Sequence, residues 1–119
     1  MEQTKALVSA IIKGVQEKKG SDISVVDFSG TEGAICRNFV ICQGSSPSQV
    51  DAIANAVEEF ARKEAGEKPI RVIGRDNAIW VAMDYGTVMV HIFVPDARAY
   101  YDLDHLWEDA PVTHVPNLD

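Results

Sequence analysis

The most constraining feature of this sequence is a pair of strand-forming runs, residues 80–84 and 87–93, separated by Tyr85-Gly86. Gly86 readily supplies the positive φ of a two-residue hairpin turn, so the pattern predicts a β-hairpin in which Asp84 faces Thr87. Successive side chains alternate between the two faces of a strand, and this register therefore sorts the hairpin into two sets. One face is aliphatic or Met (Ile79, Val81, Met83, Val88, Val90, Ile92) and the other is mixed (Ala78, Trp80, Ala82, Asp84, Thr87, Met89, His91, Phe93).

The two faces predict different surroundings. The aliphatic face predicts the core of the domain, whereas the mixed face is typical of a surface covered by something partly polar. Two interpretations of Trp80 remain open. Its ring either packs under a C-terminal helix, against Tyr100, Tyr101 or Trp107, or anchors a protein interface, where Trp is strongly enriched.

The rest of the chain predicts one α/β (α+β-like) domain. Its sheet is expected to be mixed and to have five strands, with one parallel crossover and with helices mainly on one face. The expected helices cover residues 2–19, 46–65 and 96–107, and the expected strands cover residues 22–28, 34–43, 70–73 and the hairpin. Gly20 and Gly66 are the predicted stops of the first two helices, Ser46 and Pro47 begin the second, and Pro95 ends the hairpin. The domain is expected to span residues 1–107, and residues 108–119, with two prolines, to form a loosely docked acidic tail.

Charge and composition narrow the function. Residues 96–119 hold six carboxylates and one Arg, so this last fifth carries −5 of the net charge of −7. Such an acidic end repels phosphate backbones and favours a basic partner, which argues against sequence-specific nucleic-acid binding. We expect no membrane association and a cytoplasmic location, because no apolar run is long enough to span a bilayer and the N-terminus lacks signal features. Cys36 and Cys42 are predicted to be free thiols.

Catalysis is not predicted. Gly44-Ser45 before a helix could bind a phosphate, and in nucleotidyltransferases such a pair accompanies two carboxylates two residues apart on a neighbouring strand. Residues 70–73 contain no carboxylate, and Asp84 has Ala82 and Gly86 at the two-residue offsets. We therefore expect no catalytic residue, no cofactor and no metal site. The histidines lie on separate elements without the spacing of metal ligands: His91, His105 and His114.

Two stretches resemble the ribosomal silencing factor family, also called Iojap-like. Residues 80–93 match its Trp, aliphatic run, Asp-aromatic-Gly turn, Val-rich strand and His-Ile-Phe, and residues 98–107 match its Arg, Tyr, acidic-Leu-acidic and Leu-Trp pattern. Residues 22–28, residues 39–46 and the helix that follows them also resemble the family, so the resemblance covers about residues 5–107. Arg37 stands where the family usually has Asp, and Gln43 where it usually has Thr.

The resemblance implies a nucleotidyltransferase-like sheet without catalytic carboxylates. It also implies a translational repressor that binds ribosomal protein fourteen of the large ribosomal subunit and sterically blocks joining of the small subunit. Trp80 matches the family's Trp, whereas the contact roles of the other predicted interface residues are inferred from motif position (Asp84, His91, Tyr101) or hairpin register (Met89, Phe93). Two alternatives remain: a nucleotide-binding protein using Gly44-Ser45, and a homodimeric interaction module in ribosome biogenesis.

Overall fold

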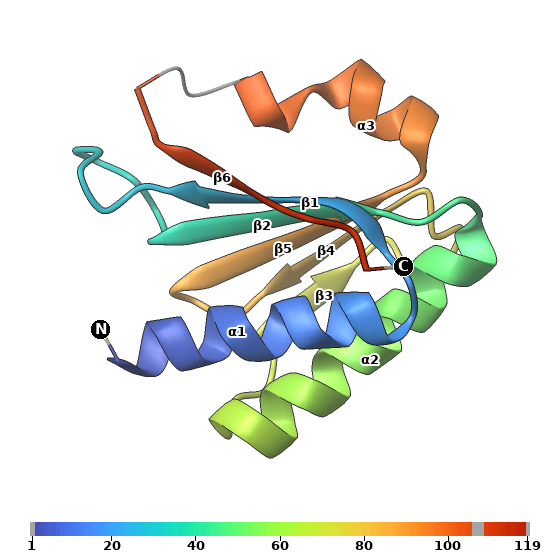
Figure 1. Ribbon diagram of the computed structural model, residues 1–119, viewed down its shortest axis with the longest axis horizontal. Coiled ribbons are helices and arrows are strands. Elements are labelled where there is room, and N and C mark those ends of the chain that lie inside the picture. The colour runs from blue at the N-terminus through green and yellow to red at the C-terminus, as the bar shows by residue number, and fades with distance from the viewer. Residues whose placement is uncertain (1, 106–108, 119) are drawn as a thin grey trace.

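The computed structural model describes residues 2–105 and 109–118 and shows a mixed sheet between two layers of helices (Figure 1). The sheet has six strands in the order β3-β4-β5-β2-β1-β6. The helices are α1 (Glu2–Glu17), α2 (Pro47–Ala65), α3 (Pro95–Tyr101) and the short 3-10 helix η1 (Leu103–His105). The strands are β1 (Ser21–Asp27), β2 (Asn38–Gln43), β3 (Arg71–Ile73), β4 (Trp80–Asp84), β5 (Val88–Phe93) and β6 (Val112–Val115).

The expected single α/β domain is confirmed, with one strand more than predicted. β2 and β5 pair in parallel at the centre of the sheet, and the other neighbouring strands are antiparallel. It follows that β2 and β3, which α2 connects, run in the same direction. The predicted parallel crossover is therefore present, but β5 and β4 lie between the two strands that it links.

The α1 and α2 helices cover one face of the sheet and enclose the larger core (Figure 1). They touch closely at Gly14, where an added Cβ would lie 2.8 Å from the carbonyl oxygen of Ala56. The predicted stop at Gly20 needs a correction, because the residue in the left-handed region is Lys19, with φ 58°. Gly20 is needed for space instead, since a Cβ there would lie 2.5 Å from Cγ1 of Val15.

The hairpin keeps its predicted faces but not its predicted turn. The backbone N–H of Tyr85 donates to the carbonyl of Val88 at 2.9 Å, so the turn residues are Gly86 and Thr87, and Asp84 pairs with Met89. The pairing is shifted by two residues, which leaves every strand side chain on its expected face. Ala78 and Ile79, which precede β4, depart from that pattern. Ala78 has a positive φ and is buried in the larger core, whereas Ile79 is exposed.

A second core lies on the other face of the sheet, under α3. The predicted helix over residues 96–107 is shorter, ends at Tyr101 and begins with Pro95, which occupies the first helical turn rather than acting as a stop. Leu106, Trp107 and Glu108 lie outside the described residues. The second core draws on β1, β2 and β5 and on the segments that follow them. Its buried members are Val26, Phe28, Phe39, Ile41, Phe93, Ala97 and Ala110.

Part of the expected tail is a strand. β6 pairs antiparallel with β1, with Val112 opposite Val26 and Val115 opposite Ile23, and the Asp27 N–H donates to the Pro111 carbonyl at 2.9 Å. Flanking prolines are compatible with an edge strand, where one side of the backbone needs no ladder partner. The loosely docked tail is thus corrected for residues 112–115.

Both cysteines are free, as predicted. Burial raises the pKa of Cys42 to about 12, so its thiol stays protonated at neutral pH. Among the described residues, no helix has the length and apolar character needed to cross a membrane.

Candidate protein-interaction surface

Trp80 begins β4 on the face of the sheet that α3 partly covers. Its ring stacks on Phe93, with centroids 5.1 Å apart, and contacts Tyr101 of α3 at 4.5 Å. The indole nevertheless remains partly exposed. Trp80 therefore packs against α3, as one of the two interpretations expects, and still presents a surface to solvent, while its role as an interface anchor stays a prediction.

His91 holds the indole in place. The Trp80 Nε1–H donates to His91 Nδ1 at 3.1 Å, and the two residues belong to adjacent paired strands. His91 is only 4% exposed, and this burial lowers its pKa to about 4. A neutral ring that accepts at Nδ1 carries its hydrogen on Nε2, and that atom is buried with no hydrogen-bond partner among the described residues.

The six predicted interface residues separate into two groups. Phe93 is fully buried and His91 nearly so, because α3 and the aromatic cluster cover them; this corrects their assignment as direct contacts. Trp80, Asp84 and Met89 are partly exposed, and Tyr101 is 48% exposed. The structure therefore places four of the residues where a partner could reach them and two beneath them as support.

Sequence reasoning missed Ile73. It pairs with Ala82, so it lies on the same face of the sheet as Trp80, and it is 53% exposed. The available signal was the apolar Ile70 and Ile73 in the predicted strand 70–73, but the face of Ile73 depends on the β3–β4 pairing. We call the resulting surface the Trp80 face, defined as Arg71, Ile73, Trp80, Ala82, Asp84, Met89 and Tyr101.

Arg98 holds α3 and η1, which border this surface, against the sheet. Its guanidinium binds Asp104 through two hydrogen bonds, Nε to Oδ2 at 3.1 Å and Nη2 to Oδ1 at 2.9 Å. It also donates to Ser24 Oγ, to Gln43 Oε1 and to the carbonyl of Asp22. Burial alone would raise the pKa of Asp104, but the Arg98 hydrogen bonds and charge hold it below its usual value. One side chain thus ties α3 and η1 to β1 and β2.

The Gly44-Ser45 segment forms a helix cap. Ser46 Oγ accepts from the Gln49 N–H at 3.2 Å, and Gln49 Oε1 accepts from the Ser45 N–H at 2.6 Å and the Ser45 hydroxyl at 2.8 Å. Gln49 Nε2 also donates to the Lys18 and Lys19 carbonyls, each at 3.1 Å, which joins the end of α1 to the start of α2. The polar groups at this junction therefore bond within the chain.

The Asp84 carboxylate also forms a hydrogen bond within its own turn. Its Oδ1 accepts from the Gly86 N–H at 2.8 Å, which supports the hairpin turn. Within residues 2–105 and 109–118, no cluster of three or more His, Cys, Asp or Glu could hold a metal ion. The Trp80 face is an aromatic and aliphatic surface with Asp84 and its cross-strand neighbour Arg71 at one end, a composition typical of surfaces that contact other proteins.

Comparisons with known proteins identify the family. The family model described as "Ribosomal silencing factor during starvation" matches residues 1–119. The chain is 38% identical over 112 residues to the ribosomal silencing factor of Halalkalibacterium halodurans, covering 94% of each protein. It is 38% identical over 103 residues to that of Haemophilus influenzae, covering 86% of this chain and 98% of the relative. This chain belongs to the ribosomal silencing factor family.

A plant relative and a solved crystal structure support the same family assignment. The chain is 29% identical over 109 residues to the chloroplast protein Iojap of Zea mays, covering 90% of this chain and 46% of that protein. A crystal structure from Chromobacterium violaceum superposes with a TM-score of 0.82 and 33% identity, covering 91% of this chain and 88% of the other. The family match includes residues 108–119, beyond the range of the resemblance seen in the sequence.

Proposed function

We propose that this protein represses translation by binding ribosomal protein fourteen of the large ribosomal subunit through the Trp80 face. The observation that carries the proposal is a partly exposed Trp held by a buried His, in a chain of the ribosomal silencing factor family. Trp is a frequent energetic anchor of interfaces, and an indole already fixed in the free protein loses little entropy on binding.

Charge supports the same partner. Ribosomal proteins that contact RNA are rich in Lys and Arg, whereas this chain has a net charge of −7. The partly exposed Asp84 lies at the end of the Trp80 face, opposite Arg71 of β3, and a basic side chain of the partner would compete with Arg71 for this carboxylate. Such charges at the rim of an interface mainly speed association and orient the two proteins.

The proposed mechanism is steric and takes place in the cytoplasm, where ribosomal subunits join. The domain measures 36 × 32 × 29 Å, so a copy seated on the joining surface would hold the small subunit away. This mechanism uses no bond-breaking step and no cofactor.

Co-sedimentation with purified large subunits tests the docking surface. We expect Trp80→Glu to lose at least about tenfold in affinity, because a charge would replace the aromatic anchor. Leu118→Glu is the matched control, since Leu118 is 66% exposed and lies beyond β6 at the other edge of the sheet. A correctly folded Trp80→Glu protein that sediments with large subunits like the wild type would refute the anchor.

Subunit joining tests the mechanism separately. Sucrose gradients of mixed subunits should show fewer joined ribosomes with the wild-type protein and no effect with Trp80→Glu. Binding without any change in joining would reject the steric mechanism and keep the docking surface. Light scattering of the free protein at several concentrations tests the homodimer alternative.

A further inference from the structure

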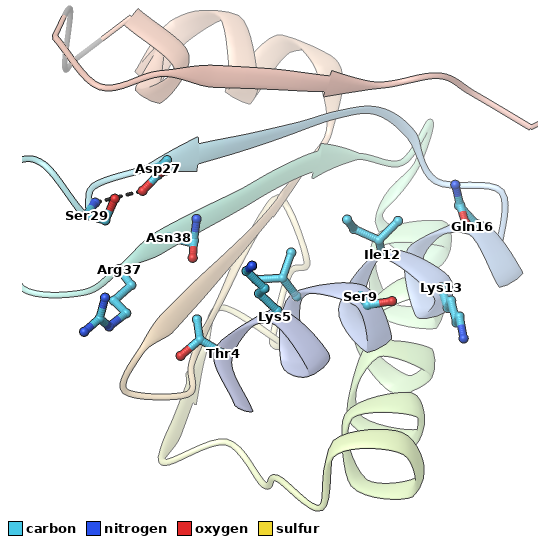
Figure 2. Close-up of a pocket in the computed structure, with 11 residues that line it drawn as sticks. Thr4, Lys5, Ser9, Ile12, Lys13, Gln16, Asp27, Ser29, Arg37 and Asn38 are labelled. Carbon is cyan, nitrogen blue, oxygen red and sulfur yellow. Dashed lines mark hydrogen bonds between the residues drawn. The ribbon is translucent and has the colours of Figure 1, made fainter. Parts of the chain in front are cut away.

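A groove lies on the opposite side of the sheet from the Trp80 face, between α1 and the end of β1 with the loop that follows it (Figure 2). Its volume is about 660 Å³. One wall is the outer side of α1, which contributes the half-buried Val8 and Ile12. The other wall includes Asp27, Arg37 and Asn38. Figure 2 shows Lys5 and Ile12 of α1 on one side of this space and Asp27 and Asn38 on the other.

The groove exists because the helical layer is narrower than the sheet. α1 packs against β2, β5 and part of β1, whereas β6 forms the edge of the sheet beyond β1 (Figure 1). Val25 and Val115 on these outer strands are only partly buried, and like Val8 and Ile12 they pack at the margin of the larger core. The sheet therefore offers an apolar strip beside α1 that no element of the described chain covers completely.

The charge of the groove differs from that of the whole protein. Its lining contains three cations, Lys5, Lys13 and Arg37, and one carboxylate, Asp27, in a chain of net charge −7. Within the described residues, neither Lys5 nor the Arg37 side chain forms an ion pair within 4.0 Å, although the Arg37 charge helps to lower the pKa of Asp27. Lys13 pairs with Glu64 at 3.0 Å, but both side chains are largely exposed, so a competing carboxylate could replace Glu64 at little cost.

Two features keep this charge pattern in place. Arg37 is anchored by its backbone, because the Phe28 N–H donates to its carbonyl at 2.8 Å and its own N–H donates to the Thr87 carbonyl at 2.8 Å. Asp27 Oδ1 accepts from the Ser29 N–H at 2.8 Å, which occupies part of the only carboxylate in the lining. The groove therefore presents an excess of positive charge beside an apolar wall, with the backbone of Arg37 held in place.

We propose that this groove binds an amphipathic helix with acidic flanks, supplied by a partner protein. The distance from Thr4 to Gln16 along α1 is about 18 Å at a rise of 1.5 Å per residue, which matches a helical segment of about twelve residues. Its apolar stripe would pack on Val8 and Ile12, and carboxylates about two turns apart would reach Lys5 and Lys13. The apolar wall, the Asp27 carboxylate and the lack of aromatic side chains in the described lining favour this occupant over RNA.

Fluorescence anisotropy with designed peptides tests the proposal. The probe is a labelled helical peptide with a Leu stripe flanked by Glu, and its counterpart carries Lys in place of every Glu. The test variant is Lys5→Glu with Arg37→Glu. The control variant, Arg62→Glu with Lys68→Glu, makes the same charge change at two exposed cations near the end of α2.

We expect the acidic peptide to bind the wild type and the control with affinities within about twofold, and the test variant at least about tenfold more weakly. The basic peptide should prefer the test variant. Trp80→Glu should bind the acidic peptide like the wild type, and the groove variant should still sediment with large subunits, so this proposal can fail independently of the proposed function.

Three results would overturn the proposal. They are no saturable binding of the acidic peptide by the wild type up to about 1 mM, equal affinities for the test and control variants, and tighter binding of single-stranded RNA than of the peptide at the same salt concentration.

Discussion

Acidification should destabilise this protein through His91. The ring is 4% exposed and contacts Phe39, with centroids 4.5 Å apart, as well as Trp80 and Phe93. Burial lowers its pKa from 6.5 to about 4. Between these two values the unfolded chain binds a proton that the folded protein does not, so stability falls as pH falls through this window. One proton changes the free energy of unfolding by 1.36 kcal/mol per pH unit, which amounts to about 3 kcal/mol across the window.

Urea unfolding followed by tryptophan fluorescence measures this effect. The wild type and His91→Gln should be compared between about pH 7 and pH 4, and their difference in unfolding free energy should change by about 3 kcal/mol in favour of the variant. His91→Gln loses packing at every pH, so the informative quantity is the pH dependence of that difference. His105→Gln is the control: His105 is exposed, its hydrogen bond to Asp102 raises its pKa, and its titration therefore has the opposite sign.

Other titrating groups do not obscure the comparison. The pKa of Asp27 and that of Asp104 are lowered in the folded protein, so both carboxylates also lose stabilising energy as pH falls. These carboxylates are present in the wild type and in His91→Gln, so their contributions cancel in the difference. Parallel stability curves for the two proteins would refute a buried neutral His91 and, with it, the Nδ1 acceptor that the Trp80 hydrogen bond requires.

Three further predictions concern stability and can be checked by thermal or urea unfolding. Arg98→Met should cost about 3 kcal/mol, because it leaves a largely buried carboxylate unpaired and frees α3 from β1. Gly74→Ala should cost more than about 2 kcal/mol, since Gly74 has φ 89° and its Cβ would lie 2.0 Å from the Trp80 carbonyl oxygen, whereas Gly30→Ala meets no atom within 4 Å and should change little. Ser46→Ala removes the side-chain cap of α2 and should cost about 1 kcal/mol.

Local patterns in the sequence were enough for much of the fold. The hairpin faces were predicted correctly although the turn was misplaced by one residue, because the resulting shift of two in the pairing preserves alternation. The cap at Ser46 and the stop at Gly66 also depend only on neighbouring residues. β6 was missed because its partner β1 lies about ninety residues earlier, and a short run between prolines gives little local signal.

The candidate site was less predictable because its exposure depends on distant segments. Trp80 could be selected by residue type and by resemblance. The burial of Phe93 and His91, however, follows from the position of α3, and the contribution of Ile73 follows from β3 pairing with β4. Arg98 appeared in the sequence only as a family motif residue, and its hydrogen bonds to Ser24 and Asp104 explain why α3 stays where it is.

The two open surfaces of this protein have a common origin in the width of its sheet. α1 and α2 leave the β1–β6 edge incompletely covered on one face, whereas α3 and η1 leave the β3–β4 edge open on the other (Figure 1). The groove and the Trp80 face therefore lie on opposite faces of the sheet and share no residue, and they approach each other at its centre, where Asn38 of the groove pairs with Val88 beside Met89. A partner helix in the groove would leave the Trp80 face free, so the proposed groove would attach a second protein to a ribosome-bound copy without competing for the ribosome.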